Sequence, residues 1–587
     1  MPAARSLTSD LAARIQSRLT FLYGPERSPA VMQALTRRLR AFEPPHRPAS
    51  DRLSERDAVL ITYGDMVRRE GEAPLRTLYD VLTRTLEGTL STVHILPFFP
   101  YSSDDGFSVI DYRTVDPALG DWGDIERLRG RFKLMFDAVV NHVSVQSRWF
   151  QGFLEGRAPY TGYFIIVPPG TDLSMVTRPR THPLLTPFQT AEGEKWVWTT
   201  FSADQVDLNY ANPEVLLAII DVLLLYVARG ASLIRLDAIA YLWKEIGTTC
   251  IHLPQTHTVV KLFRDILDAV APWVALIAET NVPHAENINY FGNGYDEAQL
   301  VYNFTLPPLT LHAIATGSAC ALTAWARTLC TPSDRTMFFN FTASHDGIGV
   351  RPAQGILSDA EIGALAARAR AHGGFVSYKS NPDGSQSPYE LNITYLDALS
   401  DPAVAEPLDL QTRRFLVSQA IALAMQGVPG IYFHSLFGSR NDNAGVEQTG
   451  RYRSINRQKL PADALLAELN KPGSLRAHVF YPYRALIRAR CAEPAFHPNS
   501  PQLVLDVGKP VFGLLRGAAV GPSPVIALHN VANAPAQVAL DLCALGLDRR
   551  SGALRDLVSG AVHELSADGI LRLELPPYAV RWLRFGD

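Results

Sequence analysis

Short apolar runs rich in β-branched residues alternate along most of the chain with longer amphipathic stretches of helical periodicity, such as 214–229, 257–270 and 413–426. Parallel strands that are buried on both faces have this nearly continuous apolar pattern, and helices connect them. The pattern therefore predicts an α/β fold, a (β/α)8 TIM barrel. The eight predicted strands are 59–63, 92–97, 133–140, 232–239, 274–280, 300–305, 337–342 and 428–433.

Two intervals between these strands are too long for simple loops. Residues 143–212 follow the third strand and are predicted to form an inserted domain. Residues 347–427 precede the eighth strand and are predicted to form a second inserted subdomain, with a turn at Asn381-Pro382-Asp383-Gly384. The barrel then consists of residues 51–142, 213–346 and, at its end, 428–500.

The two ends of the chain differ in pattern from the barrel. Residues 1–50 read as a helical extension that ends in a proline-rich break at 43–48. Residues 501–587 alternate with a period of two, which predicts a C-terminal antiparallel β domain. Its predicted strands are 503–507, 511–515, 525–530, 538–542, 570–575 and 580–585.

Polar residues stand at the ends of four predicted barrel strands, in the segments DAVVNH (137–142), RLD (235–237), AET (278–280) and ASHD (343–346). Active sites of such barrels are built at the carboxyl ends of the strands. Alone, each carboxylate is more often a helix cap or half of an ion pair, and His142 or His345 is more often a polar residue of the rim. Their joint occurrence at four strand ends favours a catalytic site.

Arg235 and Asp237 are two residues apart on one predicted strand, so their side chains point the same way. We expect the guanidinium to lower the pKa of Asp237, as a carboxylate nucleophile requires. Glu279, near other carboxylates in a partly dry pocket, is expected to have a raised pKa that suits an acid. Asp346 is the candidate third carboxylate, which stabilises an oxocarbenium-like transition state.

These four segments resemble the signature regions of the α-amylase-type glycoside hydrolase family. The resemblance implies retention of anomeric configuration, with Asp237 as covalent nucleophile, Glu279 as acid and then base, and Asp346 as transition-state stabiliser. It implies that a β-glucosyl intermediate forms on Asp237.

Further segments, among them LPFFP (96–100), SSDDGFSVIDY (102–112) and SINR (454–457), resemble the sucrose phosphorylase subfamily. Phe107 would offer a ring face to the sugar, although a core aromatic is the plain alternative. By this resemblance, the residues that line the pocket of the transferred glucose are Asp104, Phe107, His142, Gln205, Arg235, His345 and Arg457.

A phosphorylase differs from a hydrolase in that phosphate, not water, reaches the covalent intermediate. Arginine suits bidentate phosphate binding, and Arg178-Pro179-Arg180 in the first insertion resembles a matching loop of the subfamily. The plain alternative is a solvated surface pair of arginines. A hydrolase or transglucosidase therefore stays an alternative.

The acceptor segments depart from those of sucrose phosphorylases. Asn281 stands where they carry a His two residues after the acid/base Glu, and Glu390, beside Tyr389, stands where they carry Gln. These loops resemble the glucosylglycerate phosphorylase branch, which implies cleavage of 2-O-α-D-glucosylglycerate by phosphate to α-glucose 1-phosphate and D-glycerate. Sucrose and glucosylglycerol remain alternative substrates.

The composition is that of a soluble globular protein, with 47% hydrophobic and 19% charged residues and a net charge of −3. This charge does not favour a nucleic-acid or membrane partner, and five scattered cysteines favour a cytoplasmic location. The expected reaction uses phosphate as co-substrate and requires no organic cofactor and no metal. The resemblance implies a monomer or homodimer, and a catalytically inactive binding scaffold is disfavoured because the three carboxylates are present.

Overall fold

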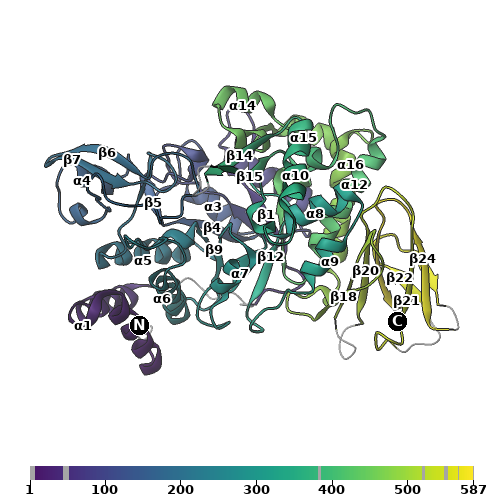
Figure 1. Cartoon of the computed structure of the whole chain (residues 1–587), viewed down its shortest axis with the longest axis horizontal. Coiled ribbons are helices and arrows are strands. Elements are labelled where there is room, and N and C mark those ends of the chain that lie inside the picture. The colour runs from purple at the N-terminus through teal and green to yellow at the C-terminus, as the bar shows by residue number, and fades with distance from the viewer. Residues whose placement is uncertain are drawn as a thin grey trace.

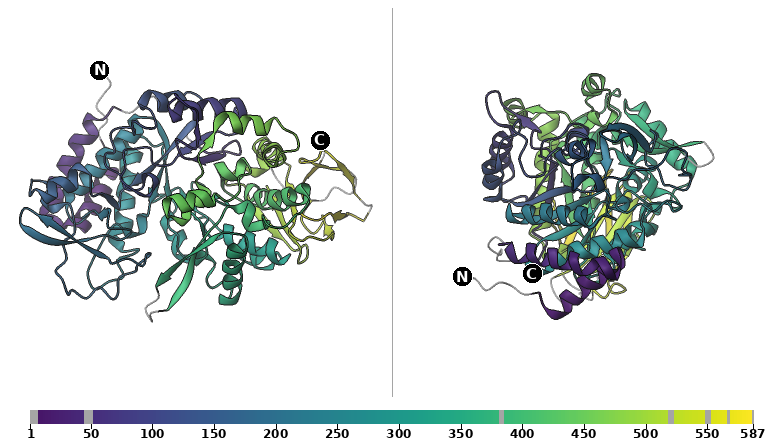
Figure 2. Two further views of the ribbon diagram at one scale, coloured as in Figure 1. Left: turned by 90° about the horizontal axis from the view of Figure 1, so that it is seen from above. Right: turned by 90° about the vertical axis from the view of Figure 1, so that its left-hand side faces the viewer.

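The computed structural model describes residues 7–43, 52–380, 385–517, 523–547, 553–565 and 568–585. Eight parallel strands close into a barrel near the centre of the molecule, surrounded by helices (Figures 1 and 2). All eight predicted strands are present, so the predicted (β/α)8 barrel is confirmed. In order around the barrel they are β1 (Val59–Thr62), β16 (Val428–Tyr432), β12 (Met337–Asn340), β11 (Leu300–Tyr302), β10 (Ala275–Ala278), β9 (Ala231–Asp237), β4 (Lys133–Val139) and β3 (Thr92–Ile95).

The strand residues of the barrel are almost all buried, which explains their continuous apolar pattern. Gly230, with φ of 92°, ends the helix before β9 and turns the chain into that strand, a conformation that favours glycine. None of the helices in the described residues is both long enough and apolar enough to traverse a bilayer. The longer helices between barrel strands are α2 (Pro74–Leu86), α3 (Trp122–Arg129), α5 (Pro213–Ala228), α6 (Pro254–Val270), α8 (Leu306–Thr316), α12 (Leu408–Ala424) and, after the last strand, α16 (Leu475–Cys491).

The N-terminal extension forms the helix α1 (Ser9–Ala41), which lies against the outside of α5 and α6 (Figures 1 and 2). Arg18 Nη1 lies 3.0 Å from Asp265 Oδ2 on α6 and ties the two helices together. Gly24, with φ of 77°, interrupts the helical backbone, so that α1 consists of two segments at an angle. Most of the proline-rich break predicted at 43–48 lies outside the described residues.

Two long intervals interrupt the alternation of barrel strands and helices. The interval after β4 forms two antiparallel strand pairs, β5 (His142–Ser144) with β8 (Gln205–Asp207) and β6 (Leu185–Thr190) with β7 (Gly193–Trp198). The interval before β16 forms the three-stranded sheet β13-β15-β14. The turn predicted at 381–384 lies outside the described residues. The remaining elements of these intervals are α4 (Arg148–Leu154), β13 (Ile348–Gly349), α10 (Asp359–Ala371), β14 (Phe375–Ser380), β15 (Gln386–Asn392) and α11 (Tyr395–Leu399).

The C-terminal region is antiparallel, as predicted. It contains a sheet in the order β18-β19-β20-β25-β22-β23 and the separate pair β21-β24. Two of its strands, β22 and β23, were not predicted, because they are short and lie in a segment of mixed polarity. The strands are β18 (Gln502–Leu505), β19 (Val511–Arg516), β20 (Val525–Asn530), β21 (Ala536–Asp541), β22 (Ala553–Asp556), β23 (Val562–Glu564), β24 (Ile570–Leu575) and β25 (Val580–Phe585).

Candidate active site

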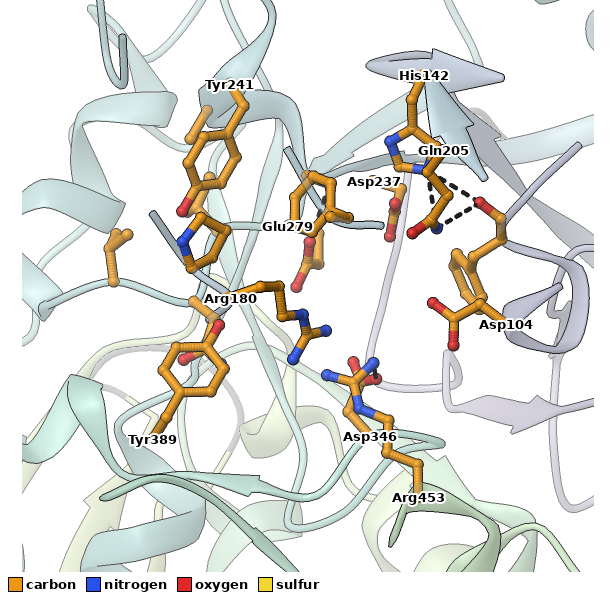
Figure 3. Close-up of a pocket in the computed structure, with 18 of the residues that line it drawn as sticks. Asp104, His142, Arg180, Gln205, Asp237, Tyr241, Glu279, Asp346, Tyr389 and Arg453 are labelled. Atoms are coloured by element: carbon orange, nitrogen blue, oxygen red, sulfur yellow. Dashed lines mark hydrogen bonds and ion pairs between the residues drawn. The ribbon is translucent and has the colours of Figure 1, made fainter. Parts of the chain in front are cut away.

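The three candidate catalytic carboxylates line one cavity at the carboxyl end of the barrel (Figure 3). Asp237 is the last residue of β9, and Glu279 directly follows β10. Asp346 comes from the loop after β12. Because carboxyl ends of parallel barrel strands open on one face, residues distant in sequence meet there.

Arg235 was predicted to line the glucose pocket, but it is buried behind the residues that line this cavity, where it contacts three carboxylates. Its Nη1 forms an ion pair with Asp137 and lies 2.9 Å from Asp237 Oδ1, and its Nη2 lies 3.9 Å from Glu279 Oε1. Only 2% of the Arg235 side chain is exposed. Asp137 also binds His94 Nε2 at 2.7 Å, so Asp137 links Arg235 to β3.

Burial in the cavity raises the pKa of both Asp237 and Glu279. The charge of Glu279 raises the pKa of Asp237 further, and the charge of Asp346 raises the pKa of Glu279 further. Arg235 opposes this effect at both groups. Our expectation that Arg235 would hold the pKa of Asp237 low was therefore wrong, because the loss of water around Asp237 outweighs the ion pair. The pKa of Glu279 is raised as expected, although its Oε2 accepts a hydrogen bond of 3.0 Å from the Ala238 amide.

The pKa of Asp346 is shifted in the opposite direction, to a lower value. Burial alone would raise its pKa, but the guanidinium groups of Arg453 and Arg457 lower it. Arg453 Nη1 lies 2.5 Å from Asp346 Oδ1, and Arg457 Nη2 lies 3.7 Å from the same oxygen. Asp346, whose pKa is lowered, is therefore ionised at neutral pH.

The residues predicted to hold the transferred glucose surround these carboxylates. The Phe107 ring stacks on His345 with centroids 4.8 Å apart, and burial lowers the pKa of His345 so that it is neutral. His142 Nε2 and Gln205 Nε2 both donate to the Phe107 carbonyl, each at 2.9 Å. These four residues line the cavity together with Asp104. Asp104, His142 and Gln205 are labelled in Figure 3.

The loop that carries Asp104 is strained, since Asp104 and Asp105 both have positive φ, 53° and 49°. Gly106 (φ 107°) is needed beside them, because a Cβ there would lie 2.6 Å from the Pro97 carbonyl. Arg457 holds this loop by an ion pair of 2.6 Å to Asp105 Oδ2. Arg457 was predicted to line the glucose pocket, but it is not among the residues that line this cavity.

Three of the five predicted acceptor residues line the cavity, namely Arg180, Asn281 and Tyr389. The Arg180 guanidinium lies 5.9 Å from the centre of the Tyr389 ring. Arg178 is exposed and donates to the His182 carbonyl instead. Glu390 is buried behind the cavity wall, where it binds Arg453.

Sequence reasoning missed Arg453, Tyr241 and Phe201, which also line the cavity. The segment SINR (454–457) begins one residue after Arg453, and a lone arginine there has no signal of its own. Phe201 and Tyr241 carry no sequence signal that distinguishes them from core aromatics. Among the described residues, no group of three or more His, Cys, Asp or Glu side chains is arranged to hold a metal ion.

Comparisons with known proteins agree with this geometry. The family model "Alpha amylase, catalytic domain" matches residues 88–347. A glucosylglycerate phosphorylase from Allomeiothermus silvanus is 55% identical, covering 90% of this chain and 94% of that protein. One from Spirochaeta thermophila is 53% identical over 89% of each chain. The solved structure of sucrose 6F-phosphate phosphorylase from Thermoanaerobacter thermosaccharolyticum matches with a TM-score of 0.71 and 26% identity, covering 83% of this chain and 96% of that one.

Phosphorylases named for the alternative substrates, sucrose and glucosylglycerol, have lower sequence identity to this chain. A sucrose phosphorylase from Bifidobacterium adolescentis is 29% identical, covering 70% of this chain and 82% of that protein. A glucosylglycerol phosphorylase from Marinobacter adhaerens is 28% identical, covering 74% of this chain and 87% of that protein. Both fall well below the identity of the two glucosylglycerate phosphorylases.

Proposed function

The chain belongs to the α-amylase family, in the branch of the glucosylglycerate phosphorylases, and on this premise we propose that it transfers glucose from glucosylglycerate to phosphate. The products are α-D-glucose 1-phosphate and D-glycerate. The observation that carries this proposal is the 55% and 53% identity to two glucosylglycerate phosphorylases over about nine tenths of the chain.

In the first step Asp237 attacks the anomeric carbon of the glucosyl group and forms a covalent ester. Glu279 donates its proton to the glycosidic oxygen, which leaves with glycerate. One proton is shared by the two carboxyls, and it belongs on Glu279, because Arg235 lies 2.9 Å from Asp237 and 3.9 Å from Glu279. Arg235 thus favours the ionised form of Asp237 over that of Glu279, against the burial that raises both pKa values.

In the second step an oxygen of phosphate attacks the same carbon, and the ester bond to Asp237 breaks. Glu279, now ionised, accepts the proton of the attacking hydrogen phosphate. Two inversions return the glucosyl group to the α configuration. Asp346, kept ionised by its arginine neighbours, stabilises the positive charge that develops on the sugar ring in both steps.

Arg180 and Tyr389 are proposed to bind phosphate at the acceptor side of the cavity, with Asn281 beside them. Arg178 has no part in this proposal, because its side chain is turned to the His182 carbonyl. The reaction as proposed uses phosphate as co-substrate and no organic cofactor. The charged phosphate ester does not cross membranes unaided, so a cytoplasmic enzyme would retain its product.

The proposal is tested by the release of glucose 1-phosphate from glucosylglycerate, glucosylglycerol and sucrose, each with and without phosphate. We expect phosphate-dependent release from glucosylglycerate. Release from sucrose alone would leave the barrel chemistry intact and overturn the choice of acceptor. Free glucose at equal rates with and without phosphate would identify a hydrolase.

A further inference from the structure

An ion pair at the acceptor side of the cavity joins Arg453, which lines the cavity, to Glu390, which is buried behind it. Arg453, in the turn Tyr452–Asn456, donates from Nε to Glu390 Oε1 at 2.9 Å and from Nη2 to Glu390 Oε2 at 2.6 Å. Two parallel hydrogen bonds of this kind fix the plane of a guanidinium. Its Nη1 lies 2.5 Å from Asp346, so Arg453 connects Glu390 to a catalytic carboxylate.

Glu390 is not placed to touch an acceptor. Only 1% of its side chain is exposed, and it is not among the residues that line the cavity. Neighbouring residues of a strand point to opposite faces, so Tyr389 on β15 faces the cavity and Glu390 faces Arg453. Gly347 makes room for Glu390, since a Cβ at that position would lie 2.6 Å from its Cγ.

Arg453, in contrast, reaches the cavity. Its side chain is 21% exposed and stands across the cavity from Arg180, with the two guanidinium groups turned toward each other between Glu279 and Asp346 (Figure 3). Among the described residues that line the cavity, these two carry the cationic side chains. Two of the five N–H groups of the guanidinium donate to Glu390, and Nη1 also forms the ion pair with Asp346, which leaves about two N–H groups for a ligand.

We propose that Arg453 is the second anion-recognition residue of the acceptor site, opposite Arg180, and that Glu390 acts only by positioning Arg453. The ligands are the two anionic acceptors, phosphate and the carboxylate of glycerate, and the inference rests on the proposed function. A planar donor fork bridges a carboxylate or phosphate well, and a neutral polyol gains much less from it. Arg453 therefore selects charged acceptors over neutral ones.

The test compares glycerate with glycerol as acceptors in synthesis from glucose 1-phosphate. Both acceptors attack the same glucosyl ester, so any damage to Asp346 cancels in the ratio of their kcat/KM values. We expect Arg453→Gln to lower the glycerate-to-glycerol ratio about 10-fold or more, as the loss of a charge-assisted hydrogen bond implies. Arg327→Gln changes an exposed arginine that lines neither the cavity nor the pocket adjoining it, and this control should leave the ratio unchanged.

The role of Glu390 is tested by non-additivity. Glu390→Gln alone should lower the ratio about 3-fold or more, and adding it to Arg453→Gln should change the ratio no further. A further drop in the double variant, or a rise with Glu390→Gln alone, would show that Glu390 acts on the acceptor directly and would overturn its positioning role. Melting curves confirm that each variant is folded.

The same measurements separate this inference from the proposed function. If both acceptors lose activity equally in Arg453→Gln, Arg453 only supports Asp346, and the inference is wrong while the phosphorylase stands. If the wild-type protein forms nothing from glycerate and glucose 1-phosphate, the proposed function is wrong, and with it the basis of the inference.

Discussion

The donor and acceptor halves of the cavity are built from different kinds of structure. The donor half uses β9 and the position directly after β10, which belong to a closed barrel whose strand residues are almost all buried. The acceptor half uses Arg180 from the inserted segment after β4, Tyr389 from the edge of a small sheet and Arg453 from a turn. Rigid strands hold the groups that make and break the bond, whereas loops hold the groups that choose the acceptor.

The strongest test of this contrast is Asp237→Asn. The change removes the nucleophile and keeps the shape and the hydrogen bond to Arg235, 2.9 Å away. We expect the loss of all glucosyl transfer, about 10⁴-fold or more in kcat, with every acceptor. Assays with phosphate, glycerate and water measure this loss. A variant that lost transfer to only one acceptor would contradict the separation of the two halves.

The next largest effect is expected for Glu279→Gln. Because burial raises the pKa of Glu279, the acid stays protonated to a higher pH than a free glutamate, and kcat/KM falls as the pH rises through that pKa. The variant should be about 10²–10⁴-fold slower with glucosylglycerate and should lack this alkaline fall. Glucosyl fluoride, whose leaving group needs little protonation, is the control and should react much faster. Equal losses with both substrates would argue against the acid role.

Arg180→Ala affects the acceptor half alone. We expect KM for phosphate to rise about 10- to 100-fold, since a charge-assisted hydrogen bond in the cavity is lost. Release of glucose to water should continue, because Asp237 and Glu279 are untouched. Arg178→Ala is the matched control, as Arg178 is exposed and lies outside the cavity. A similar rise in KM for phosphate with Arg178→Ala would show that Arg178 also contributes to phosphate binding.

The smallest effect is on stability. A carboxyl whose pKa is higher in the folded protein than in the unfolded chain loses stability as the pH rises through this interval, because its charged form is disfavoured by folding. Glu279→Gln removes this cost and should raise the melting temperature at pH 7 by about 1–3 °C. Below the pKa of about 4.3 for a free glutamate, the gain should vanish. Differential scanning calorimetry across pH measures it, and a lower melting temperature at pH 7 would contradict the direction of the shift.

Much of the donor half was predictable from the chain alone. The apolar runs located all eight barrel strands, and the polar residue at each strand end followed from the geometry of parallel barrels, so Asp237 and Glu279 could be expected to meet. Arg235 and Asp237 share a face because they are two residues apart on β9. The pKa of Asp237 was predicted in the wrong direction, because the balance between burial and an ion pair depends on how much water the fold excludes.

The acceptor half was predictable only as a set of candidate loops. Arg178 and Arg180 are equivalent in the sequence, yet one lies in solvent and the other over Tyr389. Glu390 was expected to contact the acceptor. The structure places it behind the residues that line the cavity, where it binds Arg453, and Arg453 itself lines the cavity.

The sequence by itself determined which elements form, because these depend on local periodicity. It also determined which residues stand at the carboxyl ends of the barrel strands, where active sites of this fold are built. Only the tertiary structure decided which loop side chains enter the cavity, how far burial moves each pKa, and which arginine meets which carboxylate. These outcomes depend on contacts between segments far apart in the chain, such as Glu390 with Arg453, and no local pattern encodes them.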